Sequence, residues 1–166
     1  MGRNDIEIRL ARLDEATAIA AVLWASFAEY EMLYTAEGFR ATALEPDIVR
    51  QRMQEGPLWA AALSETIVGT AAAIASSDGL YVRGMAVVPL ARGKGIAKRL
   101  LQHAEHYALS LGCSRMFLST TPFLIGAISL YERAGFRRTG EGPHDLFGTP
   151  LFTMEKWLHP VSNLSE

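Results

Sequence analysis

The sequence contains a single cysteine, Cys113, and no long apolar run. One cysteine can form neither an intrachain disulfide nor a zinc site built from several thiolates, so the chain suits a reducing compartment. The N-terminal residues lack the apolar core of a secretory signal. The most apolar stretch is interrupted by Ser76, Ser77 and Asp78, too soon to span a bilayer. We therefore expect a cytoplasmic protein that does not insert into a membrane.

A strong charge of either sign is also lacking. The chain has 16 Lys and Arg residues and 18 Asp and Glu residues, for a formal net charge of -2. Proteins whose main partner is nucleic acid are usually basic, so we expect no nucleic-acid partner. His103 and His106 lie three residues apart, as some metal ligands do, but no third ligand is evident and we expect no metal.

Length and composition fit a single globular domain. The 166 residues are enough to enclose a core, and 49% of them are hydrophobic while 20% are charged, which argues against wholesale disorder. We expect one domain over residues 1–166, in which the segment 159–166 forms a loose tail.

Hydrophobic periodicity predicts a mixed α/β fold. Apolar and polar side chains alternate over residues 6–10, as in a strand, whereas apolar side chains in 16–30 recur at helical spacing after Asp14, a candidate cap. Residues 31–43 are less periodic and indicate a loop or a broken helix. Together the elements predict a mixed, mostly antiparallel central sheet flanked by about four helices. Strands are expected at 6–10, 58–63, 66–75, 80–88, 115–120, 136–139 and 151–157, and helices at 16–30, 46–55, 96–111 and 124–134.

A glycine-rich turn between a strand and a helix is the most informative segment. It reads Ala-Arg-Gly-Lys-Gly over residues 91–95. Glycines let a ligand approach the backbone, and the first N–H groups of the following helix lie at the positive end of its dipole, so the segment suits a phosphate group. It is not a P-loop, and Lys98 stands where a dinucleotide fingerprint needs a third glycine or alanine. A glycine pair before a helix can also form an ordinary turn.

Two motifs resemble those of the GNAT superfamily of acetyltransferases. Arg92-x-x-Gly95-x-Ala97 is similar to the family's Arg/Gln-x-x-Gly-x-Gly/Ala motif. Residues 127–136, Ala-Ile-Ser-Leu-Tyr-Glu-Arg-Ala-Gly-Phe, resemble its downstream helix and the entry to the next strand. The two motifs are separated by one predicted helix and one predicted strand, as in that family.

The resemblance implies the GNAT fold and its chemistry. The strands at 80–88 and 115–120 should splay apart around the pantetheine arm of CoA, and Gly84 suits a bulge in the first of them. The implied reaction is transfer of an acetyl group from acetyl-CoA to a primary amine by direct attack, with a small molecule or a peptide as acceptor. Tyr131 would protonate the departing thiolate, since a phenol has a pKa of about 10 and a thiol one of about 8.5. Family members are often dimers, so a homodimer is a further expectation. The residues implied to bind CoA are Met85, Ala86, Val87, Val88, Arg92, Gly93, Lys94, Gly95, Ile96, Ala97, Ser119 and Tyr131.

The general base and the acceptor site are less well defined. The strand at 80–88 contains no carboxylate, and its only charged residue is Arg83. Many GNAT proteins have an asparagine where this chain has Leu124, so one polar contact to pantetheine would be missing unless Ser119, Thr120 or Thr121 supplies it. Two alternatives stay open: a donor with a longer acyl chain, and a non-catalytic acyl-CoA-binding sensor or accessory domain. The residues expected to border the acceptor are Glu29, Tyr30, Tyr34 and His144.

Overall fold

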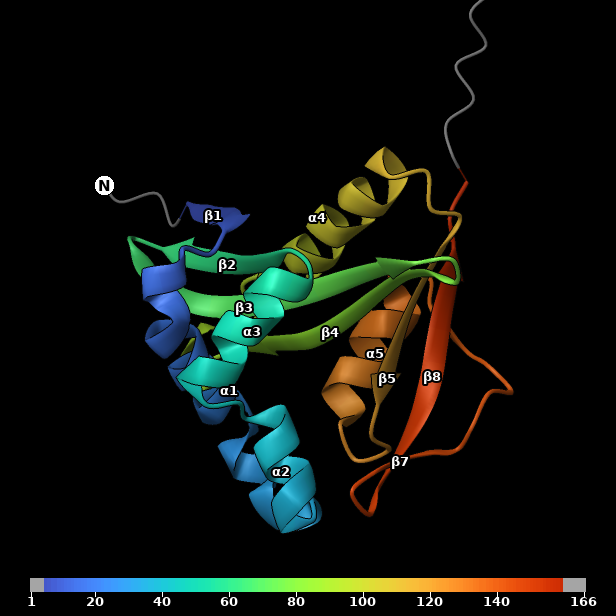
Figure 1. Ribbon diagram of the computed structural model, residues 1–166, viewed down its shortest axis with the longest axis horizontal. Coiled ribbons are helices and arrows are strands. Elements are labelled where there is room, and N and C mark those ends of the chain that lie inside the picture. The colour runs from blue at the N-terminus through green and yellow to red at the C-terminus, as the bar shows by residue number, and fades with distance from the viewer. Residues whose placement is uncertain (1–4, 160–166) are drawn as a thin grey trace, which may run out of the picture.

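The computed structural model describes residues 5–159, in which eight strands form one sheet (Figure 1). The strand order is β1-β2-β3-β4-β5-β8-β6, and β7 pairs with β8. Every neighbouring pair is antiparallel except β4 and β5, which confirms the predicted mixed, mostly antiparallel sheet. Apart from His159, the predicted tail lies outside the described residues. The strands are β1 (Ile6–Leu10), β2 (Leu58–Leu63), β3 (Thr66–Ser76), β4 (Gly79–Val87), β5 (Arg115–Thr120), β6 (Arg137–Arg138), β7 (His144–Leu146) and β8 (Thr149–Trp157).

Helices cover both faces of the sheet. Figure 1 shows α3 in front of the sheet, α2 below it and α4 behind it, and α1 packs on the same face as α3. Because side chains alternate along a strand, Ala60 and Ala72 pack with α1 and α3, whereas Ala61 and Ala71 pack on the side of α4 and α5. Within residues 5–159 no helix is both long and apolar enough to cross a bilayer. The helices are α1 (Ala16–Phe27), α2 (Ala36–Thr42), α3 (Pro46–Glu55), α4 (Ile96–Ser110) and α5 (Ile125–Arg133), with 3₁₀ turns η1 (Leu13–Glu15), η2 (Ala28–Leu33) and η3 (Pro89–Ala91).

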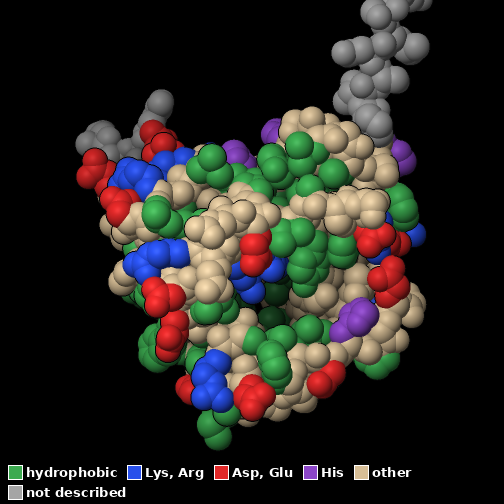
Figure 2. Space-filling view, viewed as in Figure 1, with side chains coloured by type: hydrophobic (Ala, Val, Ile, Leu, Met, Phe, Trp, Pro, Cys, Tyr) green, Lys and Arg blue, Asp and Glu red, His purple; other side chains and the backbone are tan. Residues whose placement is uncertain are grey.

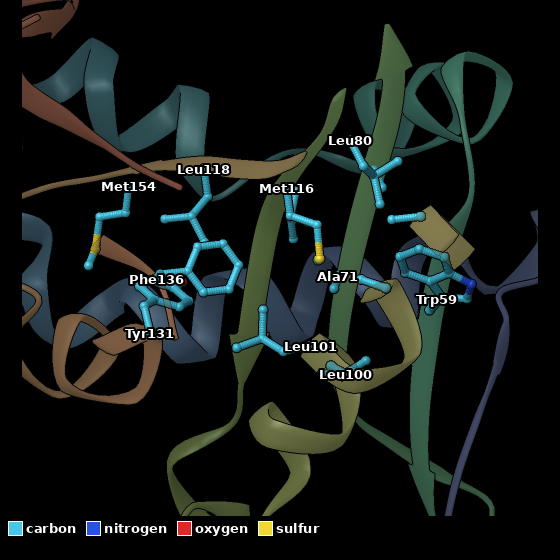
Figure 3. Close-up of a cluster of buried hydrophobic side chains, with 14 of the residues drawn as sticks. Trp59, Ala71, Leu80, Leu100, Leu101, Met116, Leu118, Tyr131, Phe136 and Met154 are labelled. Carbon is cyan, nitrogen blue, oxygen red and sulfur yellow. The ribbon is translucent and has the colours of Figure 1, made fainter. Parts of the chain in front are cut away.

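The core behind the sheet fixes the position of α5. Figure 3 shows Tyr131 and Phe136 packed among Leu101, Met116 and Leu118, which come from α4 and β5. The rings of Tyr131 and Phe136 lie 6.0 Å apart, and their side chains are buried. Tyr131 is therefore held by close packing on most sides.

The parallel pair at the centre of the sheet separates after two residue pairs. β4 and β5 pair only where Leu80 faces Met116 and Tyr81 faces Phe117. Figure 1 shows the two strands diverging from that point. The predicted splay is confirmed.

A bulge in β4 accompanies the divergence. The register between β3 and β4 shifts between Thr70 and Ala72, and Gly84 of β4 has a φ of +61° in this stretch. A left-handed backbone of this kind favours glycine. The structure therefore confirms the bulge that was expected at Gly84.

The segment 31–43, predicted as a loop or a broken helix, contains the short helix α2, whose cap Thr35 accepts a hydrogen bond from the N–H of Gly38 at 3.0 Å. His144 and Asp145 begin the short strand β7, for which no strand was predicted, and Phe147 and Gly148, both with positive φ, close its hairpin with β8. The described residues contain five α-helices, and β6 has only two residues. Elements this short have too few turns or alternations to produce a periodic signal.

The entry to α1 depends on Glu15 rather than on Asp14, the predicted cap. The carboxylate of Glu15 accepts hydrogen bonds from the guanidinium of Arg9 at 2.7 and 2.8 Å and from the backbone N–H of Arg12 at 2.8 Å. The bonds from Arg9, followed by the one from Arg12, lower the pKa of Glu15 from 4.5 to about 2, although burial opposes the shift. Asp14 is exposed and lies in η1.

Replacing Glu15 by Gln should therefore destabilise the protein in a pH-dependent way. Because the pKa is lowered in the folded state, the stabilisation is fully present above about pH 4.5 and is lost as the pH falls toward 2. At neutral pH we expect Glu15→Gln to reduce the free energy of unfolding by about 1–2 kcal/mol. Urea unfolding between pH 2 and pH 7 measures the difference. Asp14→Asn is the control and should change little. A cost of Glu15→Gln that is the same at all pH values would contradict this account.

Candidate active site

A cleft of about 520 Å³ passes through the sheet where β4 and β5 diverge. Its lining residues come from α1, η2, α2 and α3 on one face and from α4 and α5 on the other. Figure 2 shows the hollow in the middle of the near face, with apolar and Lys or Arg side chains around it. Two ligands that approach from opposite faces can therefore meet in the gap between the strands.

The glycine-rich turn brings an uncapped helix terminus to this cleft. Gly93 and Gly95 have φ values of +80° and +77°, and no other atom lies within 4 Å of where a Cβ would stand on either residue. Gly95 is the N-cap of α4, which has no side-chain cap and no acidic residue in its first turn. Lys98 and Arg99 stand there instead, although cations are unfavourable at a helix N-terminus. The free N–H groups and the two cations together suit a bound anion such as a phosphate.

A second cavity of about 630 Å³ adjoins the cleft at this turn. The two cavities share Val87, Arg92, Ala97, Leu130 and Arg133. The second is also lined by Lys98 and by Lys156, which pairs with Glu105 in the same lining. A long ligand with several phosphates therefore has a continuous, basic path from the end of α4 into the gap between β4 and β5.

Arg92 ties the glycine turn to the end of α1. Its Nη1 donates to Oε1 of Glu29, and its Nη2 donates to the carbonyl oxygen of Ser26 at 3.0 Å. Glu29, one of the residues expected at the acceptor site, is thus an ion-pair partner of the turn and does not line the cleft. The side chain of Arg92 supports the turn, while the backbone of the turn remains open to a ligand.

Two buried tyrosines line the cleft. Tyr131 belongs to α5, and Tyr34 follows η2. Burial raises the pKa of Tyr34 to about 12. Burial, followed by the nearby Tyr34, raises the pKa of Tyr131 as well. Both phenols therefore keep their protons at neutral pH and can donate hydrogen bonds.

An aromatic wall borders the front part of the cleft. Tyr30 and Tyr34 line it, and both rings pack on Phe123, with centroids 6.3 and 4.9 Å apart. The role of Phe123 as support was not predicted, since its place depends on tertiary packing. His144 does not line the cleft; it is exposed on β7, and its Nε2 lies 2.9 Å from Oγ1 of Thr153.

The charged side chains in the cleft are all cations. Among the described residues, its lining contains Arg52, Arg83, Arg92 and Arg133 but no Asp, Glu, His or Lys. The lining therefore offers no carboxylate or imidazole as a base. From the sequence, Arg83 was recognised only as the charged residue of its strand, and Arg52 was not singled out. The contact between α3 and β4 that brings them together is tertiary and leaves no local pattern.

Metal ligation has no candidate in the described part of the chain. Between residues 5 and 159, no three His, Cys, Asp or Glu side chains are grouped to hold a metal ion. His103 packs its ring against Trp59, with 5.3 Å between the centroids. It is a packing residue of α4.

The profile of the acetyltransferase (GNAT) family matches residues 18–136. The chain belongs to the GNAT family. Among solved structures, the PaiA N-acetyltransferase of Thermoplasma acidophilum, in complex with coenzyme A, has a TM-score of 0.76 and 21% identity, with 93% of this chain and 99% of that chain covered. This likeness shows that the fold is the GNAT fold.

Curated relatives are similar over part of their length. The N-acetylaspartate synthetase of Danio rerio is 40% identical over 85 residues, which are 50% of this chain and 30% of that protein. The IAA acetyltransferase of Azospirillum brasilense is 39% identical over 98 residues, which are 57% of this chain and 63% of that protein. The chain thus spans less than two thirds of the length of the curated relatives it matches first.

Polar groups stand beside the position where this GNAT chain departs from the family motif. Leu124, in place of the common asparagine, is the N-cap of α5 and lines the cleft. Ser119, Thr120 and Thr121 line it too. The Oγ1 atom of Thr120 is buried and has no hydrogen-bond partner among residues 5–159, and that of Thr121, also buried, has only the hydroxyl of Tyr34 nearby. Buried hydroxyls normally have partners, so these two are suited to a polar ligand in the cleft.

Proposed function

We propose that the chain is an N-acetyltransferase that moves an acetyl group from acetyl-CoA to a primary amine by direct attack. The observation that carries this proposal is the cleft through the sheet, because it joins an anion-binding helix terminus to an aromatic pocket on the opposite face. Membership of the GNAT family, with relatives named as acetyltransferases, supports the same activity. The acceptor is the amine of a small molecule or of a peptide.

The residues around the gap fit the parts of acetyl-CoA. The N–H groups of 92–97 would hold the pyrophosphate, and the hydroxyls of 119–121 would bind the polar groups of the pantetheine arm. Residues 85–88, at the end of β4 and just after it, do not pair with β5, so their main chain is available to the same arm. When bound, acetyl-CoA supplies the thioester carbonyl that the amine attacks.

Two donors of this chain would serve the transfer. A backbone N–H within 85–87 would donate to the carbonyl oxygen as negative charge develops on it. The hydroxyl of Tyr131 would protonate the departing thiolate; burial keeps this phenol in its protonated form, so the proton is present at neutral pH. The carbonyl donor and Tyr131 would therefore act on opposite sides of the breaking bond.

Gly95→Ala should weaken the binding of coenzyme A. A Cβ on Gly95 would strain its left-handed backbone and project into the space proposed for the pyrophosphate. We expect a loss of affinity of roughly 10-fold or more in calorimetry. Gly112→Ala is a matched control at the other end of α4, because Gly112 has a φ of +75° and equally open surroundings. Equal affinities of the two variants would contradict the assignment of the pyrophosphate site.

Tyr131→Phe should slow acetyl transfer while leaving coenzyme A binding largely intact. Loss of a general acid lowers kcat by roughly 100-fold or more. Release of free thiol from acetyl-CoA, measured with a panel of amines, amino acids, polyamines and peptides, tests both the activity and the residue. Tyr107→Phe is the control, since Tyr107 packs on Trp59 and does not line the cleft.

Two other outcomes of that assay would change the assignment. Full activity of Tyr131→Phe would remove the general acid from this residue. Tight binding of coenzyme A without thiol release for any amine would favour a non-catalytic acyl-CoA sensor. The described lining of the cleft contains no carboxylate or histidine that could act as a base, which is compatible with that alternative.

The pH dependence of kcat/KM should follow the pKa of the acceptor amine rather than that of a group on the enzyme. Among the described residues, the cleft lining contains no carboxylate and no histidine, and the pKa of Tyr34 is about 12 while that of Tyr131 is also raised. The rising limb should therefore reflect deprotonation of the free amine. Profiles for two active amines of different pKa measure this. A limb that stays at the same pH for both amines would reveal a base in the protein.

A further inference from the structure

Two arginines meet at the part of the cleft that α3 borders. Arg83 stands on β4, just before the bulge, and Arg52 reaches it from α3. Nη1 of Arg52 lies 2.9 Å from where a Cβ of Gly84 would be, so the glycine leaves space for the guanidinium. Both side chains line the cleft on the face of α1 and α3, opposite to the end of α4.

The two guanidinium groups are only partly neutralised. Arg83 donates through Nη2 to the carboxylate of Glu55, but its Nε is buried without a hydrogen-bond partner in the described part of the chain. Arg52 forms no ion pair with any residue between 5 and 159. Burial, followed by repulsion from Arg83, lowers the pKa of Arg52. Two cations and one carboxylate leave one positive charge in excess.

The rest of the lining cannot supply the missing anion. Of the other two lining arginines, Arg92 belongs to the glycine turn and Arg133 ends α5, and both also line the second cavity. No acidic side chain lines the cleft among the described residues. Partly buried cations without a partner are costly, so the site is suited to a ligand that brings its own negative charge.

We propose that the acceptor amine carries a carboxylate, which Arg52 and Arg83 bind in this part of the cleft. One excess positive charge matches a monoanion, and the flat guanidinium fork suits a carboxylate. The apolar part of the acceptor lies on the wall formed by Tyr30 and Tyr34, and its amine points toward the gap between β4 and β5. The acceptor is thus a free amino acid with an apolar side chain. Polyamines and aminoglycosides, which are polycations, are disfavoured.

This inference takes the direction of the amine from the proposed function, but its test measures binding alone. Phenylalanine and leucine are compared with their carboxamides by calorimetry on the full chain, with and without coenzyme A. We expect each amino acid to bind roughly 10- to 100-fold more tightly than its carboxamide. Arg52→Met should bind the amino acid only as tightly as the carboxamide, and Arg52→Lys should retain part of the preference.

A matched control lies on the same helix. Arg50 of α3 pairs with Asp47 on the exposed side, so Arg50→Met should keep the full preference for the carboxylate. A thermal melt of each variant shows whether its fold is intact. Carboxamides or spermidine that bind as tightly as the amino acids would overturn the proposal, and so would an unchanged preference in Arg52→Met. Carboxylate-selective binding without acetyl transfer would refute the proposed function and leave this inference standing.

Discussion

The separation of β4 from β5 is the constraint on which the site depends. The strands pair at two positions only, and beyond them the sheet is open at its centre rather than at an edge. An unpaired strand edge normally costs unsatisfied N–H and C=O groups. Here the edge faces a cleft that α4 and α5 border on one side and α1 to α3 on the other. The defect in the sheet is thus also the place where a ligand's polar groups can take over the missing hydrogen bonds.

The two halves of the sheet stay rigid despite this opening. β4 is held along most of its length by β3, and β5 is held by β8 over six residue pairs. Behind the gap, Tyr131 and Phe136 pack on the core formed with α4, so α5 cannot follow the strands apart freely. In front, Arg92 fastens the glycine turn to α1 through Glu29 and Ser26. Packing on both faces of the sheet therefore holds β4 and β5 apart.

The sequence indicated the donor half of this arrangement far better than the acceptor half. The glycine turn, the strand before it and the helix around Tyr131 are each continuous in the sequence. Their turn and periodic patterns predicted their structure, and the family resemblance implied that they lie close together. The acceptor half is assembled from short elements whose contacts are tertiary. No local sequence pattern shows where Arg52, Phe123 or β7 lies in the fold. His144 was therefore expected at the acceptor site, whereas β7 places it outside the cleft lining.

Charge in the cleft bears on how an amine can become a nucleophile there. Nearby cations lower the pKa of an amine, because they disfavour its charged form. Arginines and neutral phenols line this cleft, and among the described residues no carboxylate does, so an ammonium group finds little to stabilise it. In the proposed complex, Arg52 and Arg83 would neutralise the carboxylate of the acceptor, which would otherwise stabilise the ammonium form of its own amine. Such surroundings would favour the neutral, reactive amine and would reduce the need for a dedicated base.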